Sequence, residues 1–142
     1  YSGNREFCII NVRDKRIILR SGEFEECTDI QKLREIRNLI ADVTAPDVTI
    51  VSDHIVNLIG SLQGRIGTDK EKMLAQADRV LNLPPEEQRL YQLVRRHGIV
   101  EDYPQLASIP HPRILHLRGA AEQYYAAGQW ESHLNSILRN YV

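Results

Sequence analysis

The sequence predicts an α/β protein of the α+β kind, with a small sheet that contains a βαβ unit, followed by a mainly helical C-terminal half. Three observations support this fold class. Two β-branched runs near the start are separated by a short polar turn, and a third run, Val48–Val51, follows a helical pattern. Beyond residue 64, apolar residues recur at three- and four-residue spacing, which is typical of helices.

The first two runs predict a β-hairpin. FCIINV covers residues 7–12 and RIILR covers residues 16–20. The three residues between them are charged and match a tight turn, although none of them is glycine. We therefore expect two antiparallel strands that end near Ser21.

A helix is predicted over residues 28–42. Thr28 and Gln31 have the spacing of a capping box, in which each side chain bonds to the other residue's backbone amide. The apolar positions share one face of the helix. They are Ile30, Leu33, Ile36, Leu39 and Ile40. Pro46 prevents the helix from continuing, so the next strand, Val48–Val51, completes a βαβ unit.

The loop after this strand, Ser52-Asp53-His54, leads into a predicted helix that ends at Gly64. Its apolar residues are Ile55, Val56, Leu58, Ile59 and Leu62. Thr68 then has the capping-box spacing that predicts the start of the next helix. We expect two parts, an α/β unit at residues 1–64 and a helical subdomain at residues 65–142, that together form one compact unit.

Three further helices are expected in the C-terminal part. One begins at Pro85 and ends near Gly98, one covers residues 112–127, and the last begins near Trp130. Residues 99–112 contain three prolines and predict an ordered loop or short turns. Burial is expected at Met73, Leu90, Tyr91, Leu93 and Val94. The other apolar residues at helical spacing are Leu74, Ala77, Val80, Leu81, Ile114, Leu115, Leu117, Ala121, Tyr124, Trp130, Leu134, Ile137, Leu138 and Tyr141.

The composition favours a cytoplasmic globular protein. The formal net charge is −1 with acids and bases interspersed, so a nucleic-acid partner is not expected. No apolar run reaches the roughly 18 residues that a membrane-spanning helix needs. Cys8 and Cys27 stand far apart, as expected of reduced thiols. The chain starts at Tyr1 without a methionine, which suggests a tag remnant or an excised fragment.

Ser52, Asp53, His54 and Asn57 are the main candidates for a functional site. They follow a strand of a parallel pair, at the carboxyl edge where α/β proteins bind ligands. On a helix, positions 53 and 57 share a face, so a carboxylate, an imidazole and an amide could converge on a substrate. The alternative, which we favour on pattern alone, is that Ser52 and Asp53 only cap a helix and His54 is solvated.

Other chemistry-bearing residues give weaker signals. The five histidines show no HxxxH spacing, so no metal site is expected. Arg89, Arg95, Arg96 and His97 form a basic edge that could meet phosphates, but a solvated helix face explains it better. The C-terminal aromatic residues could contact a partner, although aromatic residues at helical spacing are more often core. They are Tyr124, Tyr125 and Trp130.

One segment resembles a known family. LREIRNLI at residues 33–40 and the text from TIVSDHIVNLIG to YQLVRR at residues 49–96 resemble the C-terminal part of radical S-adenosylmethionine iron–sulfur oxidoreductases. The likeness covers about residues 30–100, half of the chain. It implies the tail of a barrel with a helical extension, a parent enzyme that holds an iron–sulfur cluster and S-adenosylmethionine, and the remainder of that enzyme, or another protein chain, as partner.

The departures from this family limit what the chain can do alone. The family's cluster is held by a CxxxCxxC triad, which this sequence lacks. The resemblance therefore implies a non-catalytic portion that binds no cofactor by itself and lines the substrate side through Ser52, Asp53, His54 and Asn57. The alternative is a stand-alone helical interaction module that uses the aromatic region from Tyr124 to Tyr141.

Overall fold

A computed structural model of the chain describes residues 8–13, 15–21, 28–52 and 57–139. The chain divides into two compact units, Tyr1–Leu81 (unit 1) and Asn82–Val142 (unit 2). The predicted boundary after residue 64 instead falls inside unit 1, because the helix that follows belongs to the sheet-containing unit. The expectation that both parts form one compact unit stays a prediction.

Unit 1 contains a four-stranded mixed sheet of order β1-β2-β3-β4. Its longer strands are β1 (Cys8–Arg13) and β2 (Arg16–Ser21), which pair antiparallel and confirm the hairpin. β3 (Thr49–Ser52) pairs parallel with β2, and the short β4 (Gly64–Arg65) pairs antiparallel with β3. The parallel pair confirms the βαβ unit, because the chain can join two parallel strands only by a crossover.

The crossover is helix α1 (Asp29–Asp42), and its start confirms the predicted capping box. The backbone amide of Gln31 donates to Thr28 Oγ1 over 3.1 Å, and the amide of Thr28 donates to Gln31 Oε1 over 2.8 Å. Two of the otherwise unpaired amides at the helix start are thereby satisfied. The predicted apolar stripe is buried at Leu33, Ile36, Leu39 and Ile40, and Ile30 is half-buried.

The helix predicted before Gly64 is wrong for residues 57–63, which form bends and turns. Leu58, Ile59 and Leu62 are buried as expected, but within a compact turn in which the Leu62 amide donates to the Ile59 carbonyl over 3.3 Å. Gly60 disfavours a helix here, and the chain must reverse to bring β4 beside β3. Ile55 and Val56, also assigned to that helix, lie outside the described residues.

Helix α2 (Ile66–Leu81) starts before Thr68, so the second predicted capping box is wrong. A different hydrogen bond stabilises the first turn of α2: the backbone amide of Arg65 donates to Asp69 Oδ2 over 3.0 Å. Gly64 does not end a helix; it lies in β4 with φ 158°, where an added Cβ would come within 2.7 Å of Asp69 Cβ. This close approach explains the glycine without a helix stop.

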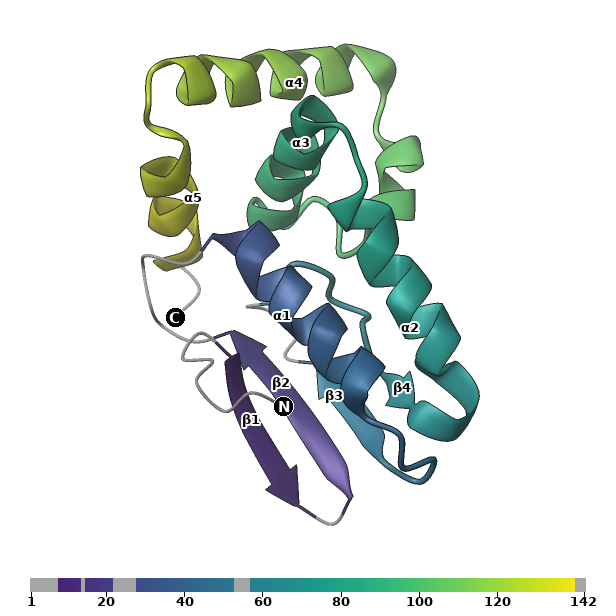
Figure 1. Cartoon of the computed structure of the whole chain (residues 1–142). Coiled ribbons are helices and arrows are strands. Elements are labelled where there is room, and N and C mark those ends of the chain that lie inside the picture. Colours follow the sequence, from purple (N-terminus) through teal and green to yellow (C-terminus); the bar gives the residue numbers. More distant parts are fainter. Residues whose placement is uncertain (1–7, 14, 22–27, 53–56, 140–142) are drawn as a thin grey trace. The chain divides into compact units, whose positions relative to one another are not determined.

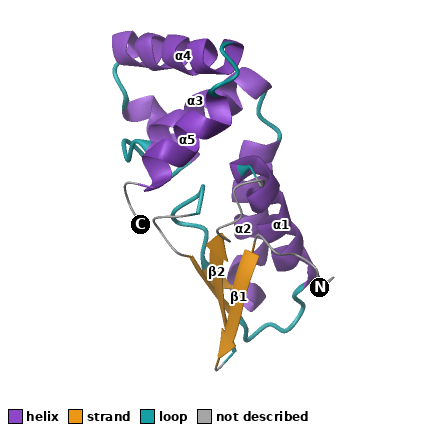
Figure 2. Ribbon diagram, turned by 90° about the vertical axis from the view of Figure 1, so that its left-hand side faces the viewer, coloured by secondary structure: helices purple, strands orange, loops and turns teal. Residues whose placement is uncertain are grey.

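Unit 1 has two layers (Figures 1 and 2). Both α1 and α2 lie side by side on one face of the sheet, and Arg37 Nε donates to Asp78 Oδ1 between them over 3.0 Å. Ile17 and Ile50, which are register partners in β2 and β3, are buried. In the part of unit 1 that the structure describes, no helix covers the opposite face, on which Val51 is half-buried.

Unit 2 consists of α3 (Pro85–Arg96), a 3₁₀ helix η1 (Tyr103–Ser108), α4 (His111–Ala126) and α5 (Trp130–Arg139). All of these agree with the predicted segments. The core joins three helices through Leu93, Ala121, Trp130 and Leu134, with Leu117, Ala120, Tyr124 and Ile137 packed around it. Leu115, one of the apolar residues at helical spacing, is 54% exposed, because the buried face of α4 centres on Ala121.

Candidate functional site

The end of β3 holds the described half of the predicted site. Asn57 Nδ2 donates to Ser52 Oγ over 2.9 Å, and both side chains are buried. Ser52 is the last residue of β3 and the register partner of Leu19 in β2. The hydrogen bond satisfies two buried polar groups and joins the two ends of the segment 53–56.

Asp53 and His54 lie outside the described residues, so their distances to Ser52 and Asn57 are not part of the geometry. Asn57 lies in a bend, and the turns that follow it are not helical. The reason for placing positions 53 and 57 on one helix face therefore does not hold. What remains is that all four residues are close in sequence at the carboxyl end of a parallel strand, where ligands gather in α/β folds.

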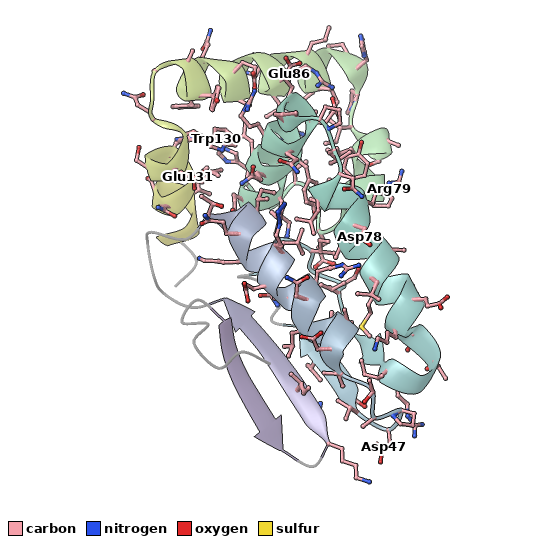
Figure 3. All side chains as sticks on the ribbon, in the orientation of Figure 1. Asp47, Asp78, Arg79, Glu86, Trp130 and Glu131 are labelled. Carbon is pink, nitrogen blue, oxygen red and sulfur yellow. The ribbon has the colours of Figure 1, made fainter. Side chains whose placement is uncertain are left out.

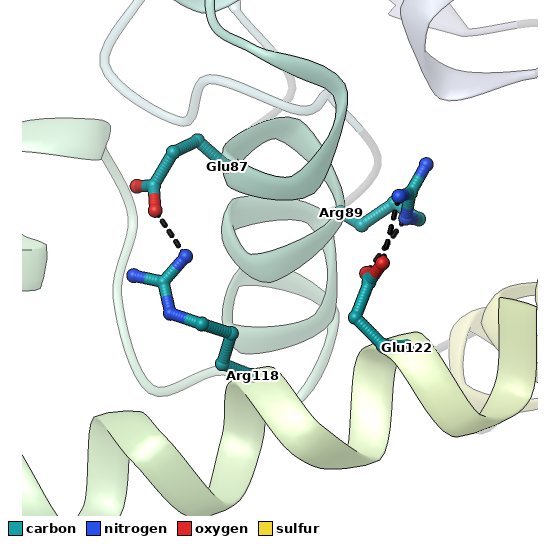
Figure 4. Close-up of polar contacts among 4 residues, drawn as sticks. All are labelled: Glu87, Arg89, Arg118 and Glu122. Atoms are coloured by element: carbon teal, nitrogen blue, oxygen red, sulfur yellow. Dashed lines mark hydrogen bonds and ion pairs between the residues drawn. The ribbon is translucent and has the colours of Figure 1, made fainter.

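Two ion pairs connect α3 with α4 in unit 2 (Figure 4). Arg89 donates from Nε and Nη2 to the two carboxylate oxygens of Glu122, each over 2.8 Å, and Arg118 pairs with Glu87. The bidentate hydrogen bond raises the pKa of the Arg89 guanidinium and lowers the pKa of the Glu122 carboxyl. These charges hold the two helices together and are not available as a catalytic acid or base.

The predicted solvated basic edge is wrong for two of its arginines. Arg95 is 7% exposed and Arg96 is 3% exposed, whereas His97 at the C-cap of α3 is exposed. Burial, followed by the nearby charge of Arg96, lowers the pKa of the Arg95 guanidinium. Burial follows from the position of α3, in which every residue from Leu90 to Arg96 is buried. Such an edge presents little positive surface to phosphates.

The three aromatic residues expected to contact a partner have different environments. Trp130 is buried in the core of unit 2, on the side of α5 that faces α3 (Figure 3). Tyr124 is half-buried and stacks on His133. Tyr125 is 54% exposed, with the Arg89 guanidinium 3.8 Å from its ring centroid. Tyr125 therefore offers a partner the largest accessible aromatic surface of the three.

A cluster of two imidazoles and a phenol ring forms where α3, α4 and α5 meet. The ring centroids of Tyr124 and His133 lie 3.7 Å apart at an interplanar angle of 11°, and those of His97 and His133 lie 6.0 Å apart at 53°. A turn at Gly128, with φ 71°, reverses the chain between α4 and α5 and brings Tyr124 opposite His133. Burial, and then the neighbouring His97, lower the pKa of His133.

Sequence reasoning missed this cluster because its members are far apart in the chain. A search for histidine pairs at helical spacing detects ligands on one helix, whereas His97 and His133 lie on different helices. The one local signal is Gly128, which separates the helical pattern of residues 112–127 from the one that begins near Trp130. Nothing in the sequence places the C-cap of α3 at the same point.

The described ranges contain no group of three or more histidine, cysteine or acidic side chains arranged to hold a metal ion. Within the same ranges, every helix is too short or too polar to cross a bilayer.

Comparison with known proteins gives no relative. No family, no curated protein and no solved structure matches the chain. Fold and site geometry are thus the basis for inferring its function.

Proposed function

We propose that the chain is a non-catalytic C-terminal portion, or accessory domain, of a radical S-adenosylmethionine enzyme, in which it completes the barrel and lines the substrate side. The observation that carries this is the parallel β2–α1–β3 unit, in which the described helices of unit 1 lie on one face of the sheet. In a βα barrel, the helices cover the outer face of the strands and side chains of the neighbouring strands fill the inner face.

The sheet face opposite α1 and α2 would be the inner face of such a barrel, whereas β1 and β4, which pair antiparallel with β2 and β3, depart from its parallel order. Val51 and Thr49 on β3 are half-buried, and their apolar atoms would be buried by further strands. In a barrel, the loops after the carboxyl ends of the strands form the site. Ser52, Asp53, His54 and Asn57 follow β3 at that end, which suits the substrate-side role.

The chain's own residues do not fit the cluster and cofactor of such an enzyme. A cluster of this kind needs three closely spaced thiolates, and the sequence has only Cys8 and Cys27. The iron–sulfur cluster and S-adenosylmethionine would be bound by the remainder of the parent enzyme or by another chain. The cytoplasm is the expected location, since both cysteines suit reduced thiols.

The decisive test is to read the coding sequence upstream of Tyr1 and to express the longest polypeptide found. A CxxxCxxC motif in the same frame, or in a chain that co-purifies with this one, is the expected result. Anaerobic reconstitution with iron and sulfide should then give absorbance near about 400 nm in the longer polypeptide and none in residues 1–142. A cluster on residues 1–142 that survives gel filtration would overturn the assignment.

Two substitutions localise the contact with the cluster-binding part. Val51→Arg places a charge on the uncovered sheet face and should abolish co-purification or cluster retention. Leu115→Lys, on the exposed side of α4, is the matched control and should leave both unchanged. Retained association in Val51→Arg would exclude a barrel joined at this face.

The second candidate function is a helical interaction module, which is favoured by the exposure of Leu115 and Tyr125 on α4, each at 54%. The two residues alone make a small patch compared with stable interfaces of about 1,200–2,000 Å². The same pair of variants separates the two functions. Loss of partner binding in Leu115→Lys, with binding kept in Val51→Arg, supports the interaction module.

A further inference from the structure

The imidazole cluster of unit 2 is separate from the strand end to which the proposed function assigns the substrate side. His97 lies at the C-cap of α3, and His133 lies in the first turns of α5. Both belong to unit 2, and the core residues Leu93 and Leu134 connect the same two helices. The packing of α3 against α5 therefore fixes the backbone positions of the two histidines.

The spacing of the two rings fits two ligands of one metal ion. Zinc binds an imidazole nitrogen at about 2.0–2.1 Å, which places the ion about 3.2 Å from the ring centroid. Two such rings on one ion have centroids about 5.2 Å apart at a tetrahedral angle and about 6.4 Å apart when opposite. The observed 6.0 Å lies between these limits.

We infer that His97 and His133 form a two-imidazole site for a divalent transition-metal ion of the zinc or nickel class, which links the end of α3 to α5. Zinc and nickel ions bind imidazole nitrogen well, whereas magnesium and calcium ions prefer oxygen ligands. Among the described residues no third histidine, cysteine or acidic side chain joins the pair, so water would complete the coordination of the ion. Two protein ligands predict reversible binding with one ion per chain.

The surroundings of His133 prepare it as a ligand. Tyr124 stacks on the His133 ring with 3.7 Å between the ring centroids, and this contact restricts the orientation of the imidazole. His97 is exposed and can rotate toward the ion, and its exposure gives the ion a route from solvent.

The test uses the full chain without a polyhistidine tag, at pH 7.5, with zinc chloride and nickel chloride as probes and magnesium chloride as control. Calorimetric titration should show one zinc or nickel ion per chain and no magnesium binding. Because the ion binds the folded state, the melting temperature should rise with zinc concentration and return on addition of a chelator.

Three variants locate the site. His97→Gln changes an exposed side chain and should weaken zinc binding at least tenfold with the fold intact, as judged by circular dichroism. His133→Gln should have the same effect on binding. His116→Gln on the exposed side of α4 is the matched control and should bind zinc like the unmodified chain. Undiminished affinity in His97→Gln, or no saturable binding by the unmodified chain, would overturn the assignment.

Discussion

The two units build their candidate sites in different ways. In unit 1, the candidate residues Ser52 and Asn57 are five positions apart and bond to each other across a short segment. In unit 2, the candidate cluster brings together His97 and His133, which lie far apart in the chain. Long-range ion pairs occur in both units, as Arg37 with Asp78 and Arg89 with Glu122 show. Local sequence can therefore suggest a site in unit 1, whereas a site in unit 2 exists only after the helices pack.

The central helices differ in the same way. α1 has a buried stripe and an opposite side with exposed residues such as Arg34, as an amphipathic pattern predicts. α3 is buried along its whole last half, including Gln92, Arg95 and Arg96. A helix with such burial must enclose polar groups, and each of them needs a compensating partner. We therefore expect substitutions in unit 2 to depend more strongly on partners that are distant in sequence.

The largest expected effect is at the core of unit 2. Leu93→Ala removes a side chain that is 1% exposed and packs with Ala121, Trp130 and Leu134. The free energy of unfolding should fall by roughly 2–5 kcal/mol, measured by urea denaturation, because a cavity replaces the buried methyl groups. Amide hydrogen exchange should accelerate most in α3, α4 and α5.

Leu115→Ala is the control for that experiment, since it makes the same chemical change at a position that is 54% exposed. It should change the free energy of unfolding by no more than about 0.5 kcal/mol. Equal effects at positions 93 and 115 would show that Leu93 is not part of the core.

A pair of glycines compares the two units directly. Gly64 in unit 1 has φ 158° and no space for a Cβ, whereas Gly119 in α4 has nothing within 4 Å of an added Cβ. Gly64→Ala should destabilise the protein by about 1–3 kcal/mol through backbone strain and the clash with Asp69. Gly119→Ala should stabilise it by about 0.5–1 kcal/mol, because alanine is the better helix former.

Thermal melting of both glycine variants under one condition checks the signs. If Gly64→Ala is as stable as the unmodified chain, Asp69 can move away from residue 64 without losing its hydrogen bond to the Arg65 amide, and the close approach is not required. A destabilised Gly119→Ala protein would mean that another group covers the exposed side of α4.

The fold was predictable wherever pattern and local chemistry agreed. Thr28 and Gln31 define a helix start by their own hydrogen bonds, and the β-branched runs became β1, β2 and β3. Residues 57–63 were predicted incorrectly because buried leucines and isoleucines are compatible with both a helix and a compact turn. The start of α2 depended on Asp69 reaching back to Arg65, and not on the nearer Thr68.

The candidate sites were predictable to a smaller extent. Ser52 and Asn57 were named from sequence and do contact each other, but as a buried, hydrogen-bonded pair at the end of β3. The burial of Arg95 and Arg96 and the approach of His97 to His133 are tertiary properties of α3, and no local signal encodes them. A near-neutral total charge likewise does not reveal which arginines are buried.

A smaller effect is expected for the pH dependence of unit 2. The pKa of His133 in the folded protein lies below the value of about 6.5 for an unfolded histidine. Between these two pKa values the unfolded chain binds a proton that the folded chain does not, so stability falls as the solution is acidified. The contribution is fully present above about pH 6.5 and is lost as the pH falls through the folded pKa.

His133→Phe keeps an aromatic ring against Tyr124 but removes the titrating imidazole at position 133. His97, the other ionisable imidazole of the cluster, remains in this variant. Denaturation in urea, with chelator present, should give a flatter dependence of stability on pH between about pH 7.5 and 5 than in the unmodified chain. An identical slope in both proteins would show that His133 does not contribute to it.

The smallest expected change in stability is at the strand end of unit 1. If Asp53 and His54 serve a substrate site and do not support the fold, Asp53→Asn and His54→Ala should leave the melting temperature nearly unchanged. If these residues line the substrate side, activity of the longest working polypeptide should fall tenfold or more, which corresponds to about 1.4 kcal/mol.

Ser52→Ala provides the contrast, because it removes the acceptor of the buried Asn57 amide and should lower stability. Unchanged activity in both Asp53→Asn and His54→Ala would assign this loop a structural role only, and would favour the interaction module based on α4.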